Sequence, residues 1–131
     1  EKVNLTEVFS ECKSLTTVDM SGWNLQNANL KKMFTDCVKL MEVNMDNCNV
    51  SGSDLTSMFG NCDKLNVVRM SGITAQNTNF TSTFYYCRNM DSVDFSNADV
   101  SGAKFYETFW HCTGLDTVNF TDWKTEGITS V

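Results

Sequence analysis

Equivalent residues recur every 25 positions along this chain of 131 residues, without a single insertion or deletion. Each unit reads FxxCxxLxxVx(M/F), so that Phe34 is followed by Cys37, Leu40, Val43 and Met45. A fixed repeat of this length is the signature of a solenoid, in which each unit forms one coil on top of the last. We therefore predict a single solenoid domain over 1–131, with units at about 8–32, 33–57, 58–82, 83–107 and 108–131. Because neither end has the pattern of a polar cap, we expect a segment of a longer chain.

The first half of each unit predicts a short helix. Leu30, Met33, Phe34 and Cys37 stand at i, i+3, i+4 and i+7, which places them on one face of a helix. Residues suited to an N-cap precede this stripe at Asn4, Asn29, Asp54 and Asn79. Lys104 occupies the equivalent position in the last instance, so we expect the helix after it to be the most poorly capped.

The second half of each unit predicts a strand, a turn and a return segment. Val43 and Met45 alternate with Glu42 and Asn44, which is the period of a strand with one buried face. Residue types that tolerate a positive φ recur after the turn, at Asn27, Gly52, Asn77, Gly102 and Gly127. The expected fold is an α/β solenoid of five units, each with one short strand in a parallel sheet and one short helix.

A competing fold has a period of five. Leu65, Met70, Ala75 and Phe80 stand five apart, and Ala28-Asn29-Leu30 is similar to the units of pentapeptide-repeat β-helices. A strict period of five would place the next inward residues at Thr35, Gly60 or Tyr85. The chain places Phe one residue earlier, at helical spacing, and this favours the helix over the pentapeptide alternative.

The overall charge excludes two classes of partner. The formal net charge is −6, and the basic residues are scattered singly. Nucleic-acid phosphates need a concentrated basic surface, and anionic membranes attract basic clusters. The sequence also lacks the long apolar run of a transmembrane helix. We therefore expect no nucleic-acid partner and no transmembrane segment.

Five of the six cysteines share one column beside Phe and Leu, and Cys48 lies outside it on a turn. We interpret the column as reduced core thiols, since an odd number would leave one thiol unpaired. His111 is the only histidine, and there is no CxxC pair or glycine-rich phosphate loop. We therefore expect no catalytic, metal or cofactor site, and a protein that is not an enzyme.

Two surfaces are candidates for binding a partner. The first is the outward face of the strands, where side chains vary while inward residues hardly change. Its residues are Thr17, Asp19, Glu42, Asn44, Val67, Arg69, Ser92, Asp94, Thr117 and Asn119. The second is an aromatic patch on the helix side, formed by Tyr85, Tyr86, Tyr106, Trp110 and His111. Exposed aromatic residues that gather in two adjacent coils are typical of interaction hot spots.

The repeats MFTDCVKLMEVNM and MFGNCDKLNVVRM resemble the BspA-like leucine-rich repeats of bacterial surface proteins, notably the subtype of mycoplasma-type lipoproteins. The resemblance implies a right-handed leucine-rich-repeat coil in a secreted or surface-anchored protein. It also implies a non-enzymatic recognition or adhesion module that binds a protein or glycan partner. The alternative is a structural spacer or assembly repeat within a larger surface protein, with no ligand of its own.

Overall fold

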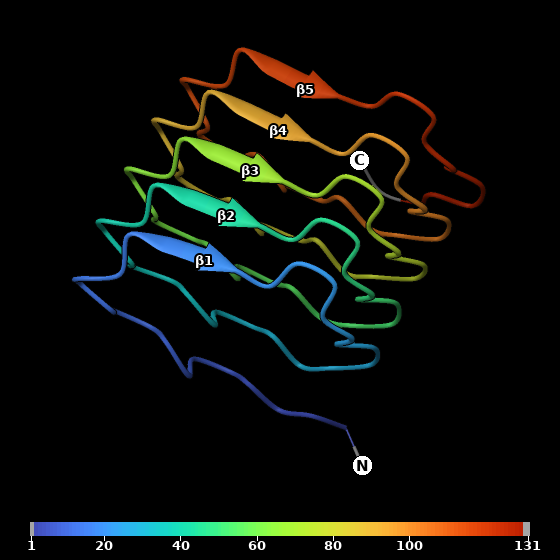
Figure 1. Cartoon of the computed structure of the whole chain (residues 1–131), viewed down its shortest axis with the longest axis horizontal. Helices are drawn as coiled ribbons and strands as arrows, with labels where there is room; N and C mark the ends of the chain where they lie inside the picture. Colours follow the sequence, from blue (N-terminus) through green and yellow to red (C-terminus); the bar gives the residue numbers. More distant parts are fainter. Residues whose placement is uncertain (1, 130–131) are drawn as a thin grey trace.

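The chain forms a parallel β-solenoid in the computed structural model, which describes residues 2–129. Five three-residue strands lie side by side in one sheet, as Figure 1 shows. They are β1 (Thr17–Asp19), β2 (Glu42–Asn44), β3 (Val67–Arg69), β4 (Ser92–Asp94) and β5 (Thr117–Asn119). All four pairings are parallel, and each residue faces the one 25 positions later. The prediction of a 25-residue coil is confirmed; the end of the last predicted unit, 130–131, lies outside the described residues.

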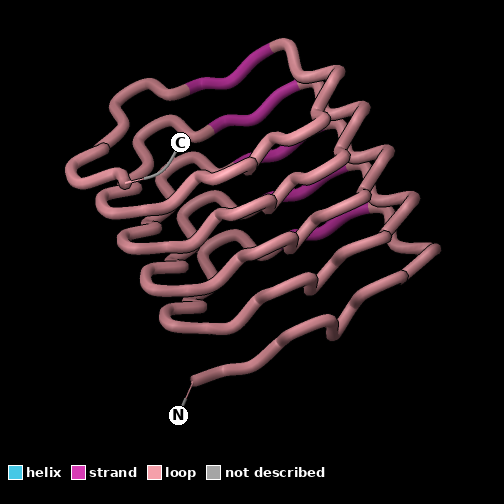
Figure 2. The backbone as a smooth tube through the Cα atoms, turned by 180° about the vertical axis from the view of Figure 1, so that it is seen from behind, coloured by secondary structure: helices cyan, strands magenta, loops and turns pink. Residues whose placement is uncertain are grey.

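The prediction of a short helix in each unit is wrong, because residues 2–129 contain no helix (Figure 2). The Phe34 N–H donates to the carbonyl of Met58 in the next coil at 2.8 Å, whereas an α-helix would direct it to Leu30. Lys32 and Asp36 have φ values of 53° and 60°, in the left-handed region that no α-helix contains. The first half of each unit is therefore a pair of tight corners.

The five-residue alternative describes the backbone better. Left-handed corners fall at Gly22, Asn27, Lys32 and Asp36, so two steps of five are followed by one step of four. The short step explains why Phe34 comes one residue earlier than a strict period of five requires. All five residues predicted to tolerate a positive φ adopt one, at Asn27, Gly52, Asn77, Gly102 and Gly127.

The residues predicted as helix N-caps have another role. Asn4, Asn29, Asp54 and Asn79 form bridges between adjacent coils. Their side-chain oxygens accept the N–H of the residue two positions on, as Asp54 does from Thr56 at 3.0 Å. Asx turns of this kind hold the backbone at each bend. Lys104 still forms the bridge to Asn79, so the last coil keeps its path without a capping side chain.

The predicted apolar columns form the core. Phe9, Phe34, Phe59, Phe84 and Phe109 stack ring on ring, with centroids 5.3 to 5.7 Å apart. The middle three rings are buried, whereas Phe9 is 43% exposed. Since each coil covers the apolar face of the next, stability comes from stacking between neighbouring coils.

A second set of hydrogen bonds ties the coils together from inside. The Phe34 carbonyl accepts the Cys37 N–H within its own turn and the Cys62 thiol of the next coil at 3.2 Å. Side chains that follow left-handed corners repeat this contact: Cys48 to Met20, Ser53 to Leu25, Thr78 to Val50, Thr108 to Phe80 and Trp123 to Phe95. The column that contains Cys37 and Cys62 therefore needs a small side chain with a hydrogen-bond donor. This requirement explains its cysteines without disulfides. All six cysteines are free.

Two corner columns alternate between Asn and Gly. A Cβ on Gly52 would meet Asn27 Oδ1 at 2.3 Å, and a Cβ on Gly72 would meet Asn47 Oδ1 at 2.5 Å. Each asparagine side chain thus lies across the glycine of the next coil. Gly102 has the same relation to Asn77, so the first four coils alternate between two kinds of corner.

Candidate binding surface

The strand face presents the ten residues expected of it. In each of β1 to β4 the central valine is buried, and its neighbours are exposed or half-buried. In β5 the central Val118 is itself half-buried. The last residues of the strands form a column, and in every strand except β3 this residue also stabilises the turn that follows. The side chains of Asp19, Asn44, Asp94 and Asn119 accept the N–H of the residue two positions later. The hydrogen bonds from Ser21 lower the pKa of Asp19. These four side chains are constrained by the turn that follows the strand.

Arg69 is the exception in this column and shows how firm the constraint is. An arginine cannot accept the N–H of Ser71, and Asp46 of the preceding coil accepts it instead at 2.8 Å. The strand-face column therefore varies less freely than the sequence suggested. Its composition follows from the backbone and does not by itself indicate a ligand.

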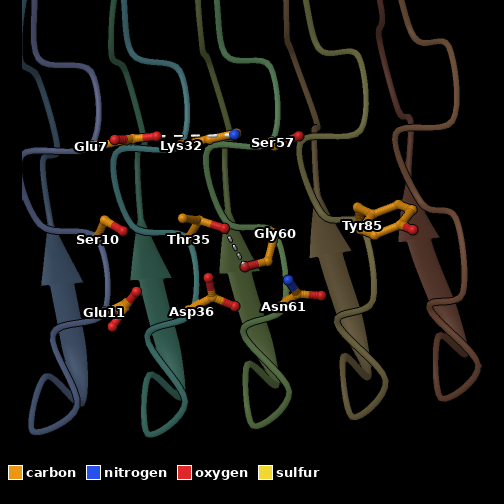
Figure 3. A pocket seen from close by; sticks show the side chains of 10 residues that line it. All are labelled: Glu7, Ser10, Glu11, Lys32, Thr35, Asp36, Ser57, Gly60, Asn61 and Tyr85. Carbon is orange, nitrogen blue, oxygen red and sulfur yellow. Dashed lines mark hydrogen bonds and ion pairs between the residues drawn. The ribbon is translucent and has the colours of Figure 1, made fainter.

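The second candidate surface, which contains the aromatic patch, lies on what we call the turn face. We define the turn face as residues 6–11, 31–36, 56–61, 81–86 and 106–111. An open depression of about 400 Å³ crosses this face over four coils, and Figure 3 shows its side chains. This turn-face trough is lined by Glu7, Ser10, Glu11, Lys32, Thr35, Asp36, Ser57, Gly60, Asn61 and Tyr85. Its long direction follows the solenoid axis, since equivalent residues of successive coils form its rows.

The trough exists because one column is small. Ser10, Thr35 and Gly60 occupy the same position in three successive coils, and Tyr85 ends the row. Gly60 is buried, and a Cβ there would lie 3.3 Å from both the Ser57 carbonyl and Thr35 Oγ1. The Thr35 hydroxyl donates to the Gly60 carbonyl at 3.1 Å, which fixes the floor. A bulky residue at position 60, such as the tyrosine at position 85, would narrow the depression.

The trough is acidic. Glu7, Glu11 and Asp36 line it, and Lys32 is its only basic residue. The Lys32 amine lies 4.0 Å from Glu7, and both side chains are more than half exposed. Such exposed pairs contribute little to stability, and this one leaves the other two carboxylates uncompensated. The trough therefore favours a ligand with positive charge or hydroxyl groups.

Beyond Tyr85 the turn face becomes aromatic. The aromatic cluster comprises Tyr85, Tyr86, Trp110 and His111: the two tyrosine rings meet edge to face at 4.4 Å, and His111 stacks on Tyr86 at 4.4 Å. Trp110 is 48% exposed and meets the His111 ring at 5.1 Å. The Arg88 guanidinium lies over Tyr86 at 4.8 Å. The structure thus brings together four of the five aromatic residues singled out in the sequence.

Tyr106 lies outside that cluster but lines a neighbouring hollow together with Trp110. Its side chain is 54% exposed, and the hydrogen bond with Glu107 raises the pKa of its hydroxyl. The spacing of four between Tyr106 and Trp110 suggested one helix face. Here the shared surface arises from two backbone corners, at Glu107 and His111.

Tyr86 has a backbone conformation that disfavours its side chain. Its φ is 59°, close to the value of every residue in this column (Glu11, Asp36, Asn61 and His111), and Asp and Asn suit left-handed backbone better than Tyr does. A bulky aromatic residue in this region is uncommon and strained. Tyr86 is half-buried, and backbone strain of this kind is often found at functional sites. No core contact requires Tyr86, because the core is built from the inward columns.

The trough was not predicted from the sequence. In the sequence, Glu7, Glu11, Lys32 and Asp36 are ordinary charged residues, and only the backbone corners bring them to one face. The signal that could have revealed it is the column of small residues at 10, 35 and 60, followed by Tyr85 and Trp110. That signal is meaningful only once these positions are known to point outward together.

No set of three His, Cys, Asp or Glu side chains within 2–129 is placed to hold a metal ion. In the same part of the chain, no helix is long and apolar enough to span a membrane. Compared with known protein families, with curated proteins and with solved structures, the chain matches none. Its function therefore has to be inferred from its own residues.

Proposed function

We propose that this chain is a non-enzymatic recognition module of a secreted or cell-surface protein, and that it binds its partner through the turn face. The observation that carries the proposal is the aromatic cluster, in which Tyr86 keeps a strained backbone while its ring remains outside the core. Trp110 is exposed beside them, and exposed aromatic side chains are typical of binding hot spots. The motifs shared with BspA-like leucine-rich repeats support the surface location and a place in that family.

The repeat itself supplies variants for a test. At each turn-face position another coil carries the replacement, so each exchange suits the local backbone. The turn-face variant combines Tyr85→Thr, Tyr86→Asn and Trp110→Ser, the residues found at Thr35, Asn61 and Ser10. The matched strand-face variant combines Glu42→Thr, Arg69→Asn and Asp94→Asn, after Thr17 and Asn44.

Wild type and both variants are applied to arrays of purified glycans and extracellular matrix proteins. We expect the turn-face variant to lose the ligands of the wild type and the strand-face variant to keep them. Circular dichroism and thermal unfolding verify that both variants are folded. Loss confined to the strand-face variant, or equal binding by all three proteins, would contradict the proposal.

An assembly role is a second candidate, and a specific observation favours it. The outer coils expose residues of the core columns, with Phe9 and Phe120 exposed by 43% and 48%. Such surfaces suit stacking on a further coil. Sedimentation velocity over a concentration series tests this role: association that Phe120→Ser weakens supports it, and a monomer at every concentration contradicts it.

A further inference from the structure

The trough has the form of a track along the solenoid axis. Glu11, Asp36 and Asn61 stand in one column on three successive coils, beside the row of Ser10, Thr35 and Gly60. Hydrogen-bonded coils are about 4.8 Å apart, so a ligand that follows the track meets a similar polar group at each step, over about 14 Å for four coils. Glu11 and Asp36 take part in none of the ion pairs found within residues 2–129.

The track ends on aromatic rings. Tyr85 closes the trough, and Trp110 occupies the same column one coil further on. Aromatic side chains combine an apolar face with a polar edge, which suits flat ligands that carry hydroxyl groups. The surface therefore changes from carboxylates and hydroxyls to rings along a single line.

A peptide fits this surface poorly. An extended peptide adds to a protein through free backbone groups, but here the N–H groups of Glu11, Asp36 and Asn61 already donate to the next coil at 2.7 to 2.9 Å. A helical peptide needs an apolar groove, and the trough is lined mainly by polar and charged side chains. A sugar chain needs neither, because its hydroxyl and amino groups bind side chains and its ring faces stack on aromatic residues.

Charge narrows the class of sugar. The acidic trough repels uronate and sulfate groups, while protonated amines would pair with Glu11 and Asp36. We propose that the turn-face trough binds an extended polysaccharide containing amino sugars, which lies along the solenoid axis with one end on Tyr85 and Trp110. This inference rests on the proposed function and specifies its ligand.

The test is isothermal titration calorimetry with a β-1,4-linked glucosamine hexamer. The buffer is mildly acidic, so that the sugar amines are protonated and Asp and Glu remain ionised. We expect the affinity for the hexamer to decrease with added salt. It should also be about tenfold lower in a double variant that combines Glu11→Asn and Asp36→Asn. Asn61 shows that the column accepts asparagine at this left-handed corner. A Trp110→Ser variant should bind both the hexamer and its N-acetylated form with about tenfold lower affinity.

The strand-face exchange Glu42→Thr serves as the control and should leave the affinity unchanged. The inference is overturned if the hexamer does not bind, or if the double variant binds it as wild type does. It is also overturned if a heparin hexamer or a lysine-rich peptide binds more tightly at the trough. If the arrays still show a ligand that depends on the turn face, the proposed function stands and only the choice of amino sugars fails.

Discussion

At the scale of single residues, the cysteine column shows how one position serves both packing and hydrogen bonding. From Cys37 onward, each thiol of the column is small enough for the core and donates to a carbonyl of the previous coil, as Cys62 does to Phe34. Burial raises the pKa of Cys62 to about 12. The inside of the solenoid therefore holds these thiols protonated, and this makes stability depend on alkaline pH.

The stability of the wild type is expected to fall as pH rises from about 9 towards 12. In that range an unfolded Cys62 has lost its proton while the folded one keeps it, so ionisation favours unfolding by at most about 1.4 kcal/mol per pH unit. Cys62→Ser keeps a donor for Phe34 and does not titrate. Urea unfolding across this pH range should show that the free energy of unfolding decreases less steeply in the variant than in the wild type. Equal slopes of stability against pH in the two proteins would contradict the raised pKa of Cys62.

At the scale of elements, the three-residue strands contribute little alone, and the stacked columns provide most of the packing. Phe59 lies between Phe34 and Phe84, with ring centroids 5.3 and 5.6 Å away. Phe9 has a ring neighbour on one side, Phe34 at 5.4 Å. The same residue in the same column is thus buried on two sides in one coil and on one side in another.

Truncation of these two rings should have unequal costs. Phe59→Ala leaves a cavity in a fully buried site and is expected to reduce the free energy of unfolding by about 3–5 kcal/mol. Phe9→Ala removes a partly exposed ring and should cost about 1 kcal/mol. Denaturant unfolding of both variants measures the difference. Equal losses would show that the column is not a continuous stack.

The same elements show what the sequence could and could not predict. The 25-residue period and the inward columns were visible because burial repeats the same residue types. The backbone path between Leu30 and Cys37 could not be predicted. Buried residues spaced three and four apart arise either from one helix or from two left-handed corners. Lys32 and Asp36 occupy those corners without a glycine to mark them. The aromatic patch was visible as a departure from the repeat, whereas the trough depends on which columns point outward together.

At the scale of the whole molecule, coils contact only their neighbours, so stability has to vary along the axis. A central coil is covered on both sides and an outer coil on one. Opening is therefore expected to begin at the outer coils and move inward. Within residues 2–129, the contacts between strands join only adjacent strands, so no strand beyond the next coil opposes this opening.

Hydrogen exchange should reveal this gradient. The N–H groups of Phe9 and Phe59 make equivalent bonds of 2.9 Å, to Met33 and to Thr83. We expect Phe59 to exchange much more slowly, because its opening requires neighbouring coils to open as well. Exchange followed by NMR measures both amides. Similar protection would indicate that the solenoid unfolds in one cooperative step.

The alternation of Asn and Gly at the corners limits how such an array can change in length. Asn27 lies across Gly52, and Asn47 lies across Gly72, so neighbouring coils among the first four are complementary and not identical. Within these four coils, inserting or removing a single coil would set two asparagines against each other at one corner and two glycines against each other at the other. Gain or loss of coils two at a time preserves the match, which makes a 50-residue pair the natural unit for duplication and for engineered extension.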